Sequence, residues 1–496
     1  MLNTFTTGHQ MSSQQGEISL RDVKGIEIIS FEGMVKCMLE NDGESYLSAY
    51  AEANGLTENE KSVVMEGLRK GLKWEWKEFD FLHTCSGKSI IPHLQLANGV
   101  FDYLDDSSQL ELLLLASQYL NPHVPWSNEK VSEAAKKLLK RYQEFGSRFL
   151  AEIKPSLLSI PNVKVSSSGY KKTGRAAGLQ PSLGFSGVGS GIFEDDKRKA
   201  WKHSADVCAL STVCGFLQIP NEDALFQDNW PAAITFILNV LDDSDPLFRA
   251  QGCFLAHTVL DTGHESVLLK SGLVDLFLES TETCLNYLPN LTPANVSLHL
   301  LQASYPLLVR LKSIRQATHL SYTEVLEKNI LGSITHVQGR DYNNETNSIL
   351  AFLLSQAEAV IIEKLEGAVL GCFSRLNYTL CQLITDPFLI DTDGGAEVID
   401  RALSVQLGCS KVFLQIDDEQ GSSLYASYKY DFLAAWVVLL RRVTKFKVGT
   451  SATMGLIKSN IEKLSALVGL EIVKEDYSAA LERNPDSLPR WSVLIQ

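Results

Sequence analysis

Residues 241–255 constrain the fold of this chain more than any other stretch, and they read Leu-Asp-Asp-Ser-Asp-Pro-Leu-Phe-Arg-Ala-Gln-Gly-Cys-Phe-Leu. Asp245 before Pro246 predicts a helix start, because aspartate caps helix N-termini and proline is tolerated at the first helical position. Arg249 follows on the new helix, and Gly252 would let two helices approach closely. A helix, an aspartate-bearing turn and an arginine-bearing helix are the layout of a HEAT repeat, in which aspartate and arginine form hydrogen-bonded ladders between stacked helix pairs. The stretch therefore predicts an all-α, HEAT-like solenoid, an architecture typical of protein-binding surfaces.

Composition fits a globular chain and narrows its partners. The chain has 496 residues, of which 45% are hydrophobic, so it has enough apolar material for an extended core. Its formal net charge of −14 disfavours nucleic-acid binding, which relies on basic surfaces. An acidic surface suits a basic protein partner instead.

The nine cysteines do not indicate a disulfide framework or a metal site, because their number is odd, their spacing is irregular and none forms a CxxC pair. We expect most of them to be small core residues, namely Cys208, Cys214, Cys253, Cys372 and Cys381. Free thiols indicate a reducing compartment, so we expect a cytoplasmic or nuclear protein.

Membrane attachment is not predicted. Residues 1–17 are polar and lack the apolar core of a signal peptide. The longest apolar run, Phe432–Leu440, has nine residues, whereas a membrane-spanning helix needs about 20.

Composition shifts along the chain predict four regions. We expect a disordered N-terminus over 1–17, a helical region over 18–160, a flexible loop over 161–193 and HEAT-like repeats over 194–496. The loop holds seven glycines and six serines, too little apolar material to order itself. Its basic group, Lys171, Lys172 and Arg175, is either a localisation signal, a tether for an acidic partner or simply solvated linker.

Capping signals and apolar periodicity place the individual helices. Thr57 with Glu60 predicts a capping box for a helix that ends near Trp76. We expect one long amphipathic helix over 127–153, a helix start at Pro293 capped by Thr292, and helix ends or breaks near Pro306, Gly367 or Gly371. Only Lys411–Ile416 alternates like a strand. The turn Leu104–Ser107 repeats the letters of Leu241–Ser244, which suggests the same helix-turn-helix unit.

Candidate chemical sites have structural explanations. Gly187–Gly191 lacks the strand and the Lys-Ser/Thr pair of a phosphate loop. His257, Asp261 and His264 could share a helix face, but they lack a fourth metal ligand. We therefore predict no catalytic, metal-binding or cofactor-binding residues. Trp201 is either a core anchor, which we favour, or an interface hot spot.

Four blocks of sequence, in order, resemble one protein family. They are Trp201-Lys202, residues 241–255, Gly272–Phe277 with Cys284–Pro293, and Leu300–Pro306. In this order and spacing the chain resembles the Tel two-interacting protein two family, a subunit of the Triple-T complex. The resemblance covers about residues 200–310. The matching positions are Trp201, Lys202, Leu241, Asp242, Asp243, Asp245, Pro246, Arg249, Gly252, Tyr287, Leu288, Pro289, Thr292, Pro293, Tyr305 and Pro306.

The resemblance implies a non-enzymatic co-chaperone adaptor. Such a subunit would dock on Tel two-interacting protein one, in a complex with Tel two, and would work with the ninety-kilodalton heat-shock chaperone. It would support the folding and steady levels of phosphatidylinositol 3-kinase-related kinases. We expect most of the matching residues to hold the repeats together. Two alternatives stay open, namely another helical-repeat scaffold of the trafficking or importin type and an all-α enzyme with a pocket between helices.

Overall fold

The computed structural model describes residues 56–141, 145–158, 198–219, 224–339, 342–415, 419–483, 485 and 488–494. The disordered N-terminus predicted over 1–17 and the loop predicted over 161–193 lie outside these residues. The predicted region boundaries at 160 and 194 therefore stay predictions.

The chain divides into two compact units. The first comprises Met1–Lys73 and Lys88–Leu115, and the second comprises Trp74–Gly87 and Ala116–Gln496. The described helical segments of the first unit are α3 (Glu58–Leu72), α4 (Ile91–Val100), the 3-10 turn η3 (Phe101–Tyr103) and most of α5 (Asp106–Ser117).

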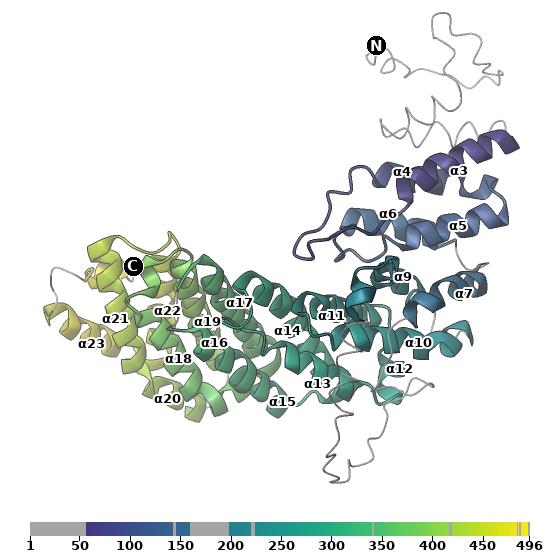
Figure 1. Ribbon diagram of the computed structural model, residues 1–496. Coiled ribbons are helices and arrows are strands. Elements are labelled where there is room, and N and C mark those ends of the chain that lie inside the picture. The colour runs from purple at the N-terminus through teal and green to yellow at the C-terminus, as the bar shows by residue number, and fades with distance from the viewer. Residues whose placement is uncertain are drawn as a thin grey trace, which may run out of the picture. The chain divides into compact units, whose positions relative to one another are not determined.

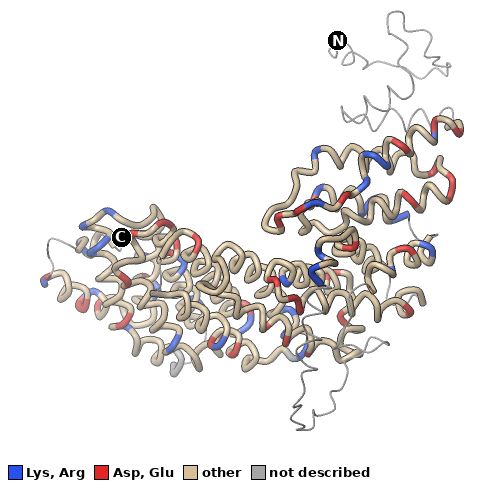
Figure 2. Tube along the Cα trace, in the orientation of Figure 1, with Lys and Arg blue, Asp and Glu red and all other residues tan. Residues whose placement is uncertain are grey.

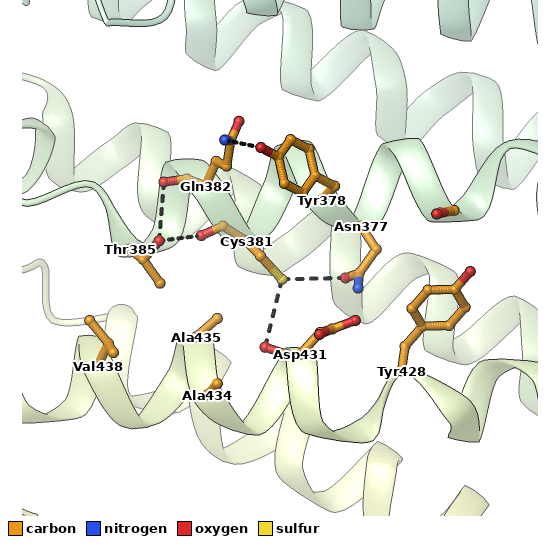
Figure 3. Close-up of a pocket in the computed structure, with 11 residues that line it drawn as sticks. Asn377, Tyr378, Cys381, Gln382, Thr385, Tyr428, Asp431, Ala434, Ala435 and Val438 are labelled. Atoms are coloured by element: carbon orange, nitrogen blue, oxygen red, sulfur yellow. Dashed lines mark hydrogen bonds between the residues drawn. The ribbon is translucent and has the colours of Figure 1, made fainter.

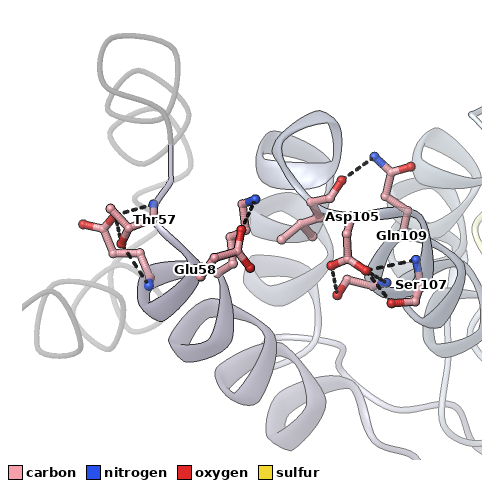
Figure 4. A network of polar contacts seen from close by, with 9 residues as sticks. Thr57, Glu58, Asp105, Ser107 and Gln109 are labelled. Carbon is pink, nitrogen blue, oxygen red and sulfur yellow. Dashed lines mark hydrogen bonds and ion pairs between the residues drawn. The ribbon is translucent and has the colours of Figure 1, made fainter.

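Side-chain caps fix the starts of α3 and α5 in the first unit, as Figure 4 shows, whereas α4 starts without one. Thr57 accepts a hydrogen bond from the Glu60 backbone, and the Glu60 carboxylate accepts one from Thr57 N at 2.8 Å. The predicted capping box is thus confirmed, although α3 ends at Leu72 rather than near Trp76. Asp105 accepts hydrogen bonds from the N–H groups of Ser107 and Ser108 and so caps α5. The Ser107 and Ser108 hydroxyls also donate to Asp105, and these bonds, ahead of the backbone ones, hold the pKa of its carboxyl far below its usual range because they favour the charged form.

The second unit is a succession of helices without a strand among its described residues, so the predicted all-α class is confirmed. Its segments, with η5, η8 and η9 as 3-10 turns and η6 and η7 as π-helical turns, are α6 (Glu129–Leu139), α7 (Gly146–Leu157), η5 (Ala205–Cys208), α9 (Ala209–Phe216), α10 (Ala224–Leu241), α11 (Pro246–Asp261), α12 (Glu265–Lys270), α13 (Val274–Cys284), α14 (Ala294–Gln316), α15 (His319–Glu324), η6 (Val325–Ile330), α16 (Leu331–Val337), α17 (Asn344–Val360), η7 (Ile361–Leu365), η8 (Glu366–Cys372), α18 (Phe373–Thr385), η9 (Leu389–Asp391), α19 (Gly395–Gln415), α20 (Glu419–Ser427), α21 (Lys429–Phe446), α22 (Thr453–Val468), α23 (Leu470–Arg483) and α24 (Trp491–Leu494).

Stacked helix pairs build this second unit. Helix α10 packs against α11, α13 against α14 and α18 against α19, while α11, α14, α17, α19 and α22 each pack against the next. In Figure 1 the helices of this row follow one another in chain order, from teal to yellow-green. Each pair contacts its neighbours in the row, which is the defining property of a helical-repeat solenoid. The core lies between the layers and contains fully buried aromatic residues such as Phe236, Tyr305 and Trp436.

Several helix boundaries differ from those predicted. The long helix expected over 127–153 is two helices, α6 and α7, with Gly146 at the start of the second. The strand-like stretch from Lys411 forms the end of α19, where the adjacent residues Val412 and Phe413 continue the buried face of the helix and Leu414 is exposed. Pro293, rather than Thr292, stands at the N-cap of α14, and the helix passes through Pro306 without ending there. The break expected near Gly367 or Gly371 is present as η8.

The two Leu-Asp-Asp-Ser turns begin helices in different registers. Helix α5 starts one residue after Asp105, whereas α11 starts four residues after Asp242 and is capped by Asp245. The shared letters therefore mark a turn in both places but not an equivalent one.

Charged residues are distributed along the helices of both units. Figure 2 shows Lys and Arg interspersed with Asp and Glu along the described chain rather than segregated into blocks. Within these same residues, none of the helices has the length and apolar character required to cross a membrane.

Candidate functional site

Lys202, Asp243 and Asp245, all among the matching positions, meet at the turn between α10 and α11. Lys202 Nζ lies 2.6 Å from Asp243 Oδ1 and 3.6 Å from Asp245 Oδ2. The Lys202 and Asp243 side chains are only 13% and 7% exposed, so this ion pair is largely shielded from water. Asp243 Oδ1 also accepts the N–H of Asp245 at 2.8 Å, and Lys202 Nζ lies 4.4 Å from the centre of the Phe248 ring. The pair therefore fastens the helical segment 198–202 to the start of α11.

Trp201 belongs to the core, as predicted. Its side chain is 6% exposed and packs edge-on against Phe236 and Phe248, with ring centres 5.8 and 6.1 Å away. Next to it, Trp76 Nε1 donates a hydrogen bond to the Lys202 carbonyl at 3.1 Å. The pair Trp201-Lys202 thus joins three parts of the chain around Phe248.

Asp245 and Pro246 form the predicted helix start. Asp245 is the N-cap of α11, and its Oδ1 accepts the N–H of Leu247 at 2.9 Å. Pro246 occupies the first helical turn, where the missing N–H costs nothing. This element of the sequence interpretation is confirmed in full.

Arg249 joins α11 to α13, although its partners differ from those expected. Its Nη1 donates to Thr283 Oγ1 at 2.9 Å and contacts Cys284 Sγ at 3.8 Å, and its guanidinium lies 5.1 Å from the Tyr287 ring centre. Lys202 pairs with the turn aspartates Asp243 and Asp245, a contact that the expected ladder did not include. Asp242 makes a parallel connection, because its Oδ1 accepts from Ser280 Oγ at 2.6 Å.

Replacing Arg249 with glutamate should lower the free energy of unfolding by about 1–3 kcal/mol, because it removes these contacts and places a carboxylate near Asp242. Chemical denaturation of the two proteins measures the difference. Arg483→Glu, at the exposed end of α23, is the control and should unfold like wild type. Equal unfolding curves for Arg249→Glu and wild type would show that Arg249 does not hold the repeats together.

Similar polar links recur further along the row. Asn347 Nδ2 donates to Thr392 Oγ1, 45 residues away, and Thr453 Oγ1 donates to Asp400 Oδ1, 53 residues away. The Asp242–Ser280 link spans 38 residues. HEAT-type repeats have about 40–47 residues, so these separations of 38 to 53 residues are close to one repeat, and each link ties a turn or helix of one repeat to the next. Sequence reasoning missed these partners, because only the repeat length hints at them.

Gly252 of α11 lies directly against the backbone of Leu241 at the end of α10. A Cβ atom at Gly252 would lie 2.4 Å from Leu241 Cα, a backbone atom that cannot move aside. The predicted need for a small residue at this position is therefore confirmed.

The other signature residues, as we call the positions that match the family in sequence, lie in the partly exposed loop between α13 and α14 and in α14 itself. Leu288 and Thr292 are buried, and His336 Nε2 donates to the Pro289 carbonyl at 2.9 Å. Tyr305, inside α14 next to Pro306, is fully buried and its hydroxyl lies 3.3 Å from Ser333 Oγ. Beside the loop lies a hollow of about 350 Å³, at whose edge Leu291 is 97% exposed. These residues hold the segment between α13 and α14 against η6 and α16.

The suspected metal ligands have other partners. Arg310 Nη1 donates to Asp261 Oδ1 at 2.6 Å, and His257 Nε2 donates to the Ala303 carbonyl at 3.2 Å. His264 is buried and its Nε2 lies 3.0 Å from the Leu217 carbonyl. Within the described ranges, no group of His, Cys, Asp and Glu is arranged to hold a metal ion.

The predicted core cysteines divide into two groups. Cys214, Cys253 and Cys372 are buried, whereas Cys208 and Cys381 are partly accessible. Burial raises the pKa of each of these five thiols. They are therefore thiols rather than reactive thiolates at neutral pH.

Three histidines with lowered pKa values, none of them fully buried, should make the protein sensitive to acid. His123 stacks on Phe254 with ring centres 3.8 Å apart, and burial, followed by the nearby His257 and His299, lowers its pKa to about 4. Burial also lowers the pKa of His257 and of His299. The unfolded chain, with histidine pKa values near 6.5, therefore binds more protons than the folded chain between about pH 6.5 and 4.

We expect the free energy of unfolding to fall as the pH drops through this window, with about 1.4 kcal/mol per pH unit as the ceiling for a fully buried histidine and less for these three, which solvent screens in part. Denaturation curves at pH 7.5, 6 and 5 measure this dependence. His123→Phe keeps the stacking but cannot titrate, so its curve should depend less on pH. An unchanged pH dependence in that variant would exclude His123 as a contributor.

Comparison with known proteins yields a match to a family model. No curated protein and no solved structure matches the chain. A model of the Tti2 family matches residues 112–391, which is more than half of the chain. The matched region contains every signature residue described above, and it extends well beyond the 200–310 stretch on which the resemblance was first seen. The chain therefore belongs to the Tti2 family.

Proposed function

We propose that this protein is a non-catalytic scaffold subunit of the Triple-T co-chaperone complex. In this role it docks on Tel two-interacting protein one, in a complex that also contains Tel two. Through that complex it supports the maturation and stability of phosphatidylinositol 3-kinase-related kinases, together with the ninety-kilodalton heat-shock chaperone. We place this activity in the cytoplasm, the nucleus or both.

The observation that carries the proposal is the family match over a helical-repeat stack. Stacked helix pairs present long continuous faces, which suit the binding of other proteins. The signature residues support a structural role, because Lys202, Asp243, Arg249 and Gly252 all make contacts between helices. These side chains hold neighbouring helices together, which supports a scaffold role.

Affinity purification of the tagged full-length protein from its native cells, followed by mass spectrometry, tests the proposal. We expect stoichiometric recovery of Tel two and Tel two-interacting protein one at moderate salt. Depletion of the protein should also lower the steady levels of the kinases. A preparation that contains neither subunit, or that is dominated by transport receptors or coat proteins, would contradict the proposal and favour a different helical-repeat scaffold.

A further inference from the structure

A groove runs between the neighbouring helices α18 and α21, outside the signature residues. Figure 3 shows α18 and α21 side by side, with Tyr378, Cys381 and Gln382 on one wall and Asp431, Ala434 and Val438 on the other. The groove holds about 370 Å³, and its residues on α18 extend from Ser374 to Thr385. At 1.5 Å per residue that length is about 16 Å, or three helical turns.

The floor of the groove is small and apolar, whereas its wall is aromatic. Ala434 is exposed, Ala435 is buried and Val438 is partly exposed, so nothing bulky fills the floor. Tyr378 is 64% exposed, and its hydroxyl accepts a hydrogen bond from Gln382 Nε2 at 2.7 Å. An exposed aromatic wall beside a small floor can receive apolar side chains from another molecule.

Several polar groups of the groove, mostly on α18, are bonded to one another, as Figure 3 shows. Cys381 Sγ contacts Asn377 Oδ1 at 3.5 Å and the Asp431 carbonyl at 3.8 Å. Thr385 Oγ1 donates to the Cys381 carbonyl at 2.8 Å. An extended peptide would need free backbone partners along its length, whereas a helix satisfies its own backbone and needs only pockets for side chains.

The charge along the groove face of α21 changes sign from one end to the other. Positions 431, 434, 438, 441 and 445 recur every three or four residues, so they share one face of the helix. This face begins with the exposed carboxylate of Asp431 and ends with Arg441 and Lys445, both exposed. Arg442 adds a further cation at this end, where its Nη1 donates to the Asp386 carbonyl at 2.9 Å.

We propose that the α18–α21 groove docks an amphipathic helix of a partner subunit, and this inference rests on the function proposed above. The docked helix runs parallel to α21, because its negative C-terminal end is then placed at the basic end of the groove and its positive N-terminal end near Asp431. Apolar residues at positions i, i+4 and i+7 fill the groove, and acidic residues in the last turn of the docked helix meet Arg441 and Lys445.

A pair of alanine-to-arginine substitutions tests the groove. Ala434 and Ala466 are both exposed and lie on the neighbouring helices α21 and α22, but only Ala434 lines the groove. Each full-length variant is reconstituted with the other two subunits of the Triple-T complex, and the dissociation constant is measured. Ala434→Arg should weaken binding about tenfold or more, whereas Ala466→Arg should bind like wild type. Should Ala434→Arg fail to fold, Tyr378→Ala removes the exposed wall instead and should also weaken binding.

The salt dependence of binding tests the proposed contact between Arg441 and the acidic end of the docked helix. Arg441→Glu should weaken binding most at low salt, with the difference shrinking as salt rises. Tighter binding by Arg441→Glu would overturn the assigned orientation of the docked helix. Wild-type protein that captures neither subunit would refute the proposed function itself. Normal capture by wild type, Ala434→Arg and Tyr378→Ala alike would leave that function standing and overturn the docking groove.

Discussion

Replacing Asp243 with alanine is expected to lower the free energy of unfolding by up to about 3–5 kcal/mol, the usual cost of removing one partner of a buried ion pair, although Asp245 Oδ2 stays 3.6 Å from Lys202 Nζ. The Lys202 ammonium would lose its 2.6 Å contact in a site where its side chain is 13% exposed. The N–H of Asp245 would lose its acceptor as well, which weakens the start of α11. Both losses occur at the turn between α10 and α11, so both weaken the attachment of segment 198–202 to the start of α11.

Equilibrium denaturation of Asp243→Ala, Lys202→Met and the double variant measures this effect. The double variant should lose less than the sum of the two single variants, because it leaves no unpaired buried charge. Lys474→Met provides the control, since Lys474 pairs with Glu471 at the surface, where their side chains are 46% and 72% exposed. Strictly additive losses would show that Lys202 and Asp243 do not interact in solution.

Gly252→Ala is expected to lower the free energy of unfolding by about 2–3 kcal/mol, even though alanine is the better helix former. The added methyl would meet Leu241 Cα at 2.4 Å, so α10 and α11 would have to separate. The same substitution at Gly455 in α22 meets nothing within 4 Å. Gly455→Ala should therefore raise stability by up to about 1 kcal/mol, since alanine has the higher helix propensity.

Thermal and chemical unfolding of the two glycine variants gives this comparison directly. Opposite signs for Gly252→Ala and Gly455→Ala would show that close helix packing, and not helix propensity, determines the residue at position 252. Two stabilised variants would mean that α10 and α11 are not in close contact in solution.

The parts of the structure that depend on residues close together in the sequence were predictable. Thr57 with Glu60, and Asp245 with Pro246, identify helix starts because the capping side chain and the backbone N–H that donates to it lie within three residues of each other. The apolar periodicity likewise indicates helices throughout, which the structure confirms. The requirement for glycine at position 252 followed from the helix-turn-helix layout alone.

Contacts between repeats were not predictable, because their partners are distant in the sequence. Nothing near Arg249 indicates that its hydrogen bond goes to Thr283, 34 residues away, or that Lys202 meets Asp243, 41 residues away. The α18–α21 groove was not predicted for the same reason, because its walls belong to two helices that are distant in the sequence. Periodicity also failed to show where the helix expected over 127–153 ends and a second helix begins.

The row of helices from α11 to α22 has a consequence for shortened forms of the protein. Because α17 packs against α14 on one side and α19 on the other, a chain cut after α17 would keep the first contact and lose the second. The surface of α17 that α19 now covers would be opened to water, and newly opened apolar surface promotes aggregation. A premature stop in the last third of the gene should therefore yield an unstable fragment that cellular quality control removes, not a smaller working subunit.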